Sequence, residues 1–143
     1  LREACEILIG VDLSPGMIEQ ARARGCYDEL AACDMVKFLE TQAEAGCDLA
    51  IAADVFVYVA DLNPLMAAIA RALKPSGLVA FSVETHAGAG VVLGEKLRFA
   101  HAADHVREAI GNAGLALLTL DAASTRTESR IPVPGLIAVG IKR

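Results

Sequence analysis

Residues 6–25 read EILIGVDLSPGMIEQARARG, an apolar run followed by the signals of a helix start and a helix end. Its apolar run ends at Asp12, after which Ser14 is a natural helix N-cap and Pro15 a natural first helical residue. Gly25 follows an arginine-bearing last turn, as is typical of a helix end. The stretch therefore predicts a strand, a tight turn and a helix, with an aspartate where the strand ends. We expect the apolar stripe Leu13, Met17, Ile18 and Ala21 to be the buried face of this helix.

The same alternation of strand and helix continues along the chain. Apolar runs predict further strands at 30–33, 48–53, 78–84, 115–120 and 136–141, and helical periodicity predicts helices after 36, over 61–73 and over 103–113. This alternation is typical of α/β layering. The almost wholly apolar run 48–53 predicts a central strand covered on both faces. The glycine-rich stretch 86–90 predicts a mobile loop, and the last two strands, which lack a helical pattern between them, predict an antiparallel pair.

Length and composition limit the class of protein. The chain has 143 residues, of which 55% are hydrophobic, and a net charge of -5, so we expect one folded domain over 1–143 that binds neither nucleic acid nor membrane. No apolar run approaches the length of a membrane span, and the start has no signal-type core, which predicts a cytoplasmic protein. Four cysteines without a C-x-x-C pair favour neither a disulfide framework nor a metal site.

Three of the expected strands end in an acid, at Asp12, Asp34 and Asp54. In an open α/β sheet, ligands lie outside the carboxyl ends of the strands. A carboxylate there can accept hydrogen bonds from the two neighbouring hydroxyls of a ribose. The alternative is that these residues only cap helices or form turns. Asp12 is the clearest candidate because Ser14 already fills the capping role, whereas Asp34 remains ambiguous.

Three ordered motifs then carry a resemblance to a family. Residues 10–21 resemble the second strand and following helix of class I S-adenosylmethionine-dependent methyltransferases, where V-D-x-S-x-x-M recurs. Residues 48–59 resemble that family's fourth strand and the substrate-side segment after it. Residues 71–78, RALKPSGL, are similar to the R-x-L-K-P-G-G turn before strand five, with Ser76 where glycine is usual. The likeness is to methyltransferase type 11, and residues 98–101 and 132–136 resemble bacterial members attached to helical repeat domains.

The resemblance implies an α/β fold: a Rossmann-like doubly wound sheet of order 3-2-1-4-5-7-6 that closes with the C-terminal antiparallel pair. The family's first strand and its glycine-rich D-x-G-x-G-x-G turn have no counterpart before Glu6. We therefore expect the first strand to be missing from this chain, between the strands at 7–11 and 49–53. The chain is expected to be the C-terminal portion of a longer domain, or to receive that strand from a rearranged or partner segment.

The resemblance further implies S-adenosylmethionine as cofactor and a binding site made of Asp12, Leu13, Met17, Asp34, Met35, Ala53, Asp54 and Val55. Asp12 would hold the ribose hydroxyls, Leu13 would border the adenine, and Asp34 with Met35 would lie against the adenine's amino edge. Residues 53–55 would line the methionine end. No metal is expected.

The expected reaction is direct in-line methyl transfer to a small-molecule acceptor, with no catalytic residue assigned. His86 and His101 are candidates for a general base, although a structural or surface role is the favoured interpretation for each. His105 is expected on a helix surface. Asp54 and Tyr58 could favour a cation nearby, whereas Phe56 is expected in the core.

Two other functions remain open at the level of sequence. A nicotinamide-dependent oxidoreductase would use Asp12 in the same way, because that cofactor also carries an adenosine ribose. A non-catalytic truncated domain would hide exposed strands against another copy as a homo-oligomer. A repeat-associated scaffold role for the parent protein also remains open. The acceptor does not follow from the sequence.

Overall fold

The computed structural model describes residues 2–94, 96–124 and 126–143. They divide into two compact units, with the division between Gln42 and Ala43.

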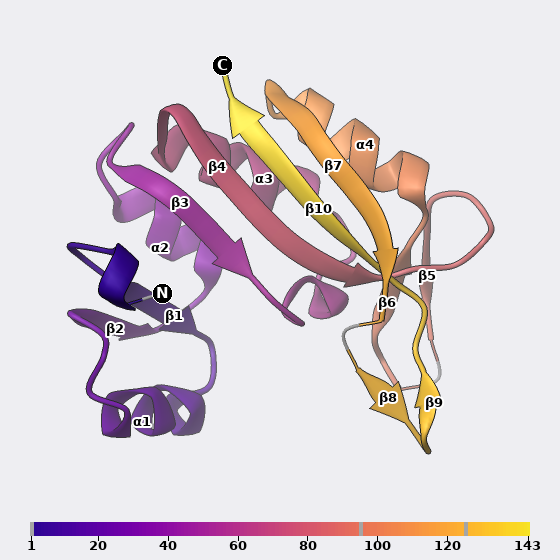
Figure 1. The fold of residues 1–143 in the computed structure, drawn as a ribbon, viewed down its shortest axis with the longest axis horizontal. Helices are drawn as coiled ribbons and strands as arrows, with labels where there is room; N and C mark the ends of the chain where they lie inside the picture. The colour runs from indigo at the N-terminus through magenta and orange to yellow at the C-terminus, as the bar shows by residue number, and fades with distance from the viewer. Residues whose placement is uncertain (1, 95, 125) are drawn as a thin grey trace. The chain divides into compact units, whose positions relative to one another are not determined.

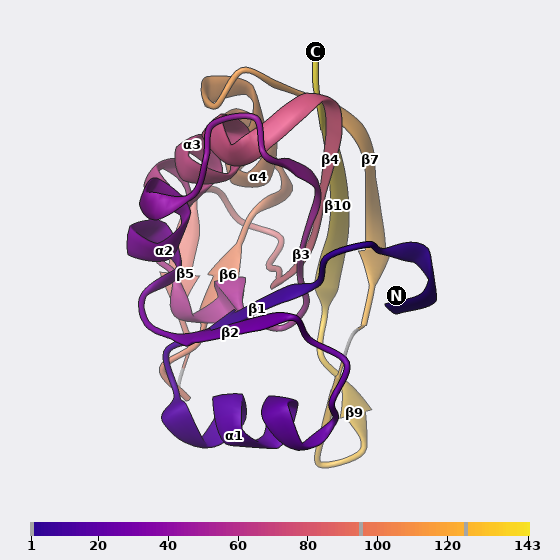
Figure 2. The same cartoon turned by 90° about the vertical axis from the view of Figure 1, so that its left-hand side faces the viewer.

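The first unit is a parallel strand pair with its crossover helix. Its elements are η1 (Arg2–Ala4), β1 (Ile9–Asp12), α1 (Pro15–Ala23), β2 (Glu29–Ala32) and α2 (Met35–Thr41). Strands β1 and β2 pair in parallel, with Asp12 opposite Ala32 at their carboxyl ends. Helix α1 lies alongside the two strands in both views (Figures 1 and 2). The predicted strand, turn and helix are confirmed.

The ends of α1 follow the signals in the sequence. Ser14 Oγ accepts a hydrogen bond from Met17 N at 3.4 Å, and Gly25 has φ +64°, a conformation that glycine adopts without strain. The prediction that the whole apolar stripe is buried is wrong. Ile18 is buried, but Leu13 and Met17 are 73% and 51% exposed. A pair of strands is too narrow to cover every apolar position of the helix that crosses it.

The second unit is a mixed sheet with two helices. Its elements are β3 (Cys47–Ala52), η2 (Phe56–Tyr58), α3 (Asn63–Ala72), β4 (Leu73–Glu84), β5 (Val91–Leu93), β6 (Phe99–His101), α4 (Ala103–Asn112), β7 (Leu115–Ala123), β8 (Thr127–Glu128), β9 (Ile131–Pro132) and β10 (Gly135–Lys142). Strand β4 pairs in parallel with β3 and β6 and antiparallel with β10, which in turn pairs antiparallel with β7 (Figure 1). The α/β class and the antiparallel C-terminal pair are confirmed.

The core of the second unit lies between its sheet and helices α3 and α4, which lie on the same side of the sheet (Figure 2). Phe56 contacts Phe81 with ring centroids 4.7 Å apart, and α3 buries Leu65 and Met66 almost completely. The opposite face of β3 is open, since Leu49 and Ile51 are 41% and 50% exposed.

The prediction that the run at 48–53 forms a central, doubly covered strand is therefore wrong for this unit's sheet. Among the described residues, β3 pairs with β4 alone, and β1 likewise pairs with β2 alone. An apolar strand sequence is compatible with coverage on both faces. It does not show that other elements of the unit cover both faces. The expected absence of the family's first strand stays a prediction.

Sequence periodicity missed four short strands. The stretch after the glycine-rich loop forms β5 and β6, an antiparallel pair, and the polar connection between β7 and β10 contains the hairpin of β8 and β9. Each of these strands has two or three residues. Such lengths are too short to produce a recognisable alternation.

Leu65→Ala is expected to lower the free energy of unfolding of the second unit by about 2–5 kcal/mol, because the residue is 2% exposed and its truncation leaves a cavity. Leu118→Ala is the matched control, since Leu118 on β7 is 54% exposed and should change stability by less than about 1 kcal/mol. Urea unfolding followed by circular dichroism measures both. Equal losses would show that the core does not lie under α3.

Candidate functional site

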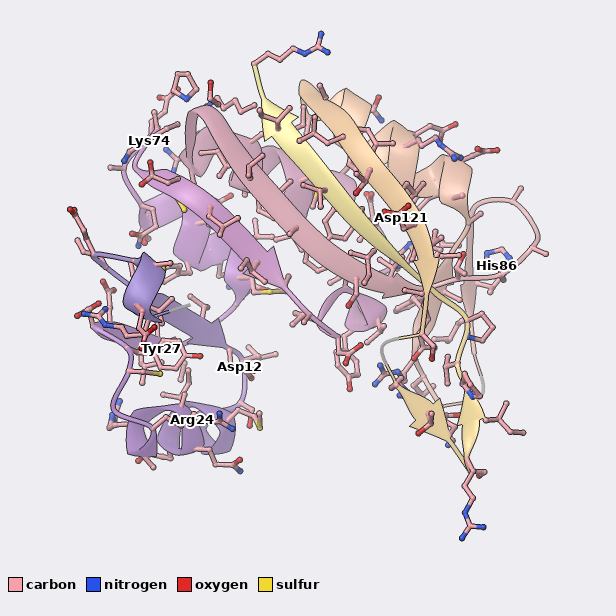
Figure 3. The ribbon with its side chains drawn as sticks, viewed as in Figure 1. Asp12, Arg24, Tyr27, Lys74, His86 and Asp121 are labelled. Atoms are coloured by element: carbon pink, nitrogen blue, oxygen red, sulfur yellow. The ribbon has the colours of Figure 1, made fainter. Side chains whose placement is uncertain are left out.

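The junction of β1 and α1 brings Asp12, Leu13 and Met17 together. Asp12 Oδ1 accepts a hydrogen bond from Ser14 N at 2.7 Å, which fixes the carboxylate at the end of the strand. Figure 3 shows this side chain at the carboxyl end of β1. A shallow cavity of about 150 Å³ is lined by Gly10, Val11, Asp12, Met17, Ile18, Ala21, Tyr27 and Leu30. The site therefore offers one fixed carboxylate beside exposed apolar side chains.

The junction of β2 and α2 places Asp34 and Met35 next to this site. Cys33 N donates to Asp12 O at 3.1 Å, which links the carboxyl ends of the two strands. Asp34 is the N-cap of α2, and its Oδ1 accepts from Lys37 N at 3.0 Å. The capping role that the sequence left open for Asp34 is thus present, and one carboxylate oxygen is committed to it. Met35 is the first residue of the helix and is half-buried.

In the second unit, Ala53, Asp54 and Val55 form the turn between β3 and η2. Asp54 has φ +56°, a left-handed conformation that costs most residues free energy, and its N donates to Ser82 Oγ at 2.9 Å. Ser82 is buried on β4. This hydrogen bond ties the turn to the neighbouring strand and holds residues 53–55 at the carboxyl edge of the sheet.

The aromatic residues after this turn have different roles. Phe56 is 1% exposed against Phe81, which confirms that it belongs to the core. Tyr58 is 64% exposed, and its ring lies 5.1 Å from the guanidinium carbon of Arg98. The cation that contacts the Tyr58 ring is thus the guanidinium of Arg98, from the same chain.

A charged cluster at the end of β4 was missed by the sequence analysis. Glu84 Oε1 accepts from Arg98 Nε at 2.6 Å and lies 3.5 Å from Arg126 Nη1. The signal was present, because Glu84 is the last residue of an apolar strand, as Asp12 is, and Asp34 and Asp54 closely follow theirs. Its partners, Arg98 and Arg126, are distant in the sequence, and no local pattern predicts these ion pairs.

The candidate bases His86 and His101 have structural roles. His86 is labelled in Figure 3, and it orders the glycine-rich loop, since its Nδ1 accepts from Gly88 N at 3.1 Å and its Nε2 lies 3.3 Å from Gly90 O. His101 is fully buried at the end of β6, and no described residue hydrogen-bonds either ring nitrogen. Its ring stacks on His105 at 5.3 Å. His105 is half-buried, so its expected place on the helix surface is wrong.

The pKa of His101 is lowered, chiefly because burial disfavours the imidazolium and also because of the neighbouring His105. The backbone carbonyls of Phe56 and Val59 oppose the shift without reaching hydrogen-bonding geometry. His86 adds a smaller effect in the same direction as His105. His101 is therefore neutral at pH 7 and out of reach of solvent.

The stability of the second unit should therefore fall on acidification. Unfolded histidine has a pKa of about 6.5, and the pKa of His101 in the folded chain is lower. As the pH drops below about 6.5, His101 therefore binds a proton in the unfolded chain before it does so in the folded chain. We expect a loss of up to about 1.4 kcal/mol per pH unit in that window. His101→Phe should remove this step, whereas His86→Gln should retain it. Urea unfolding between pH 7.5 and 5 tests this, and an unchanged slope in His101→Phe would contradict the assignment.

Comparison with known proteins finds a family and several solved structures that are similar to this chain. The family model described as a methyltransferase domain matches residues 1–81. Among solved structures, a SAM-dependent methyltransferase from Methanosarcina mazei is 12% identical with a TM-score of 0.73, covering 94% of this chain and 81% of that one.

Two further structures are similar. The 1,6-didemethyltoxoflavin-N1-methyltransferase of Burkholderia thailandensis, with bound 1,6-didemethyltoxoflavin and S-adenosylhomocysteine, is 18% identical with a TM-score of 0.72 and covers 94% of this chain and 60% of that one. The [4+2]-cyclase SpnF is 16% identical with a TM-score of 0.79 and covers 99% and 69%. At such identities the likeness shows the fold alone, and the cyclase shows that this fold also serves another reaction.

No protein with a curated description matches the sequence. Among the residues that the structure describes, no helix is long and apolar enough to cross a bilayer.

Proposed function

The chain belongs to the methyltransferase-domain family, whose model matches more than half of its length. We propose that it transfers a methyl group from S-adenosylmethionine to a small-molecule acceptor by direct in-line displacement. A structural relative that binds both a small molecule and S-adenosylhomocysteine supports the cofactor and the class of acceptor. The family match favours this reading over a nicotinamide-dependent oxidoreductase.

The geometry of Asp12 carries the proposal. One of its oxygens is held by Ser14 N at 2.7 Å, and among the described residues none donates to the other oxygen. A carboxylate oriented in this way, at the carboxyl end of a parallel strand and beside a cavity, fits the vicinal hydroxyls of a ribose. Leu13 and Met17 expose apolar side chains next to it, which suits the flat face of an adenine. The residues present thus fit the cofactor.

The remaining contacts are assigned as the family pattern implies. Met35 and the unoccupied side of Asp34 would contact the adenine edge, while Ala53, Asp54 and Val55 would line the methionine end. The hydrogen bond from Asp54 N to Ser82 Oγ at 2.9 Å supports this role, because it fixes the turn that carries these residues. We further infer that the two units are parts of one methyltransferase domain that includes residues 1–143.

When bound, the cofactor supplies a methyl group that its sulfonium has already activated. The residues of the chain then need only orient the acceptor and exclude water, so no covalent nucleophile is required. No general base is assigned. His101 is buried and neutral, and His86 is engaged with its own loop. An acceptor whose nucleophilic atom is already deprotonated would need no base.

The non-catalytic reading makes a different prediction. A domain that protects its exposed strand edges by self-association would be oligomeric and would not bind the cofactor. Light scattering combined with the titration below separates the two, because a monodisperse monomer that binds S-adenosylhomocysteine contradicts self-association as the function.

Titration with S-adenosylhomocysteine by calorimetry tests the proposal. Asp12→Asn keeps an oxygen for Ser14 N but removes the charge, so we expect the dissociation constant to rise about tenfold or more, as for loss of hydrogen bonds to a charged group.

Asp48→Asn is the matched control, because Asp48 pairs with Lys74 at 2.8 Å on the surface of the second unit and should leave binding unchanged. No heat with the unmodified protein would refute the proposed function. Binding that is equal in Asp12→Asn and the unmodified protein would refute the role of Asp12.

A further inference from the structure

Arg98 is held by two side chains at the carboxyl end of β4. Its Nε donates to Glu84 Oε1 at 2.6 Å, and its Nη1 donates to the Tyr58 hydroxyl at 2.9 Å. The side chains of Arg98 and Glu84 are 14% and 16% exposed, so this ion pair is largely removed from water. Charge-assisted hydrogen bonds in such surroundings are strong and orient the guanidinium firmly.

One nitrogen of the Arg98 guanidinium, Nη2, has no hydrogen-bond acceptor among the described residues. This nitrogen is buried. Buried donors are nearly always paired, and leaving one unpaired costs free energy. An unsatisfied guanidinium nitrogen at the ligand-binding edge of a sheet therefore indicates a partner outside the chain.

The charges around Arg98 point to the same kind of partner. Arg126 lies 3.5 Å from Glu84 and also pairs with Glu128, which in turn lies 3.2 Å from Lys96. These described residues amount to three cations against two carboxylates. The buried Arg98 Nη2 lacks an acceptor among these described residues, and an anionic group supplies the acceptor oxygens that a guanidinium binds best.

We propose that Arg98 is the specificity-determining residue for the acceptor and binds its carboxylate group. This rests on the proposed function. A guanidinium edge pairs with a carboxylate through two parallel hydrogen bonds. The two hydrogen bonds would come from Arg98 Nη1 and Nη2. Nη1 now donates to the Tyr58 hydroxyl, and the acceptor's carboxylate replaces this hydroxyl. Tyr58 is 64% exposed, so it can move aside with little loss of buried surface.

The surroundings indicate an apolar body on the acceptor. Leu97 precedes Arg98 and is 73% exposed, Leu93 is 54% exposed opposite Phe99, and Ile131 is 69% exposed opposite Glu128. Leu97 adjoins Arg98 in the chain, and Leu93 and Ile131 lie on the strands that pair with β6 and β8. The acceptor class is therefore an aromatic or aliphatic carboxylic acid.

Benzoate serves as the probe and benzamide as its neutral counterpart of the same shape. In the unmodified protein, NMR of the arginine Nε–H groups should show a saturable shift at Arg98 with benzoate and none with benzamide. Arg98→Gln should weaken benzoate binding by about tenfold or more. Arg107→Gln is the matched control, because Arg107 pairs with Asp104 at 2.9 Å on the exposed side of α4.

Tyr58→Phe separates this proposal from a merely structural ion pair, and it leaves the contact between Arg98 and Glu84 intact. Removing the competing hydroxyl should tighten benzoate binding about two- to tenfold, the equivalent of one ordinary hydrogen bond. A structural role for Arg98 predicts no gain. Unchanged or weaker binding in Tyr58→Phe, equal responses to benzoate and benzamide, or no response at Arg98 would each overturn the inference.

The same samples are titrated with S-adenosylhomocysteine. If benzoate fails to bind while the cofactor product binds, the inference is wrong and the proposed function stands. If benzoate binds as expected and the cofactor product does not, the carboxylate site stands but its assignment to a methyl acceptor falls.

Discussion

The second unit depends on the backbone pairing of β4. This strand pairs with β3 at Leu73 and from Leu78 to Phe81, with β10 on its other edge and with β6 at Glu84. The parallel ladders bring the carboxyl ends of β3 and β4 to one edge of the sheet. Two side chains near the end of β4 then organise this edge. Ser82 holds the turn after β3 through Asp54 N, and Glu84 holds Arg98. Both parts of the site described for this unit are consequences of one strand.

The fold was predictable where the sequence repeats a local pattern. Apolar runs that end in an acid gave the positions of β1, β2 and β3, and the signals at Ser14 and Gly25 gave the ends of α1 to within two residues. Such patterns are short-range and are read directly from neighbouring residues. The class of the fold and the antiparallel close of the sheet followed from the order of these elements.

The site was only partly predictable, because its contacts join distant residues. Arg98 and Tyr58 are 40 positions apart, and their hydrogen bond depends on the packing of η2 against β6 rather than on any local motif. The burial of His101 has the same origin. A histidine between a short strand and a helix resembles a surface residue in the sequence, and only the packing of η2 and α4 around it shows that it is enclosed.

The first unit buries a single hydrophobic side chain, Ile18, among its described residues. A unit with so little enclosed apolar surface opens locally at a small free-energy cost. A ligand that binds only the closed form raises this cost with the logarithm of its concentration, through thermodynamic linkage. If the proposed cofactor binds at Asp12, it would therefore order the first unit. Amide hydrogens of β1 and β2 would then exchange with solvent slowly in the complex and quickly without it, and part of the intrinsic binding free energy would be used to order the polypeptide.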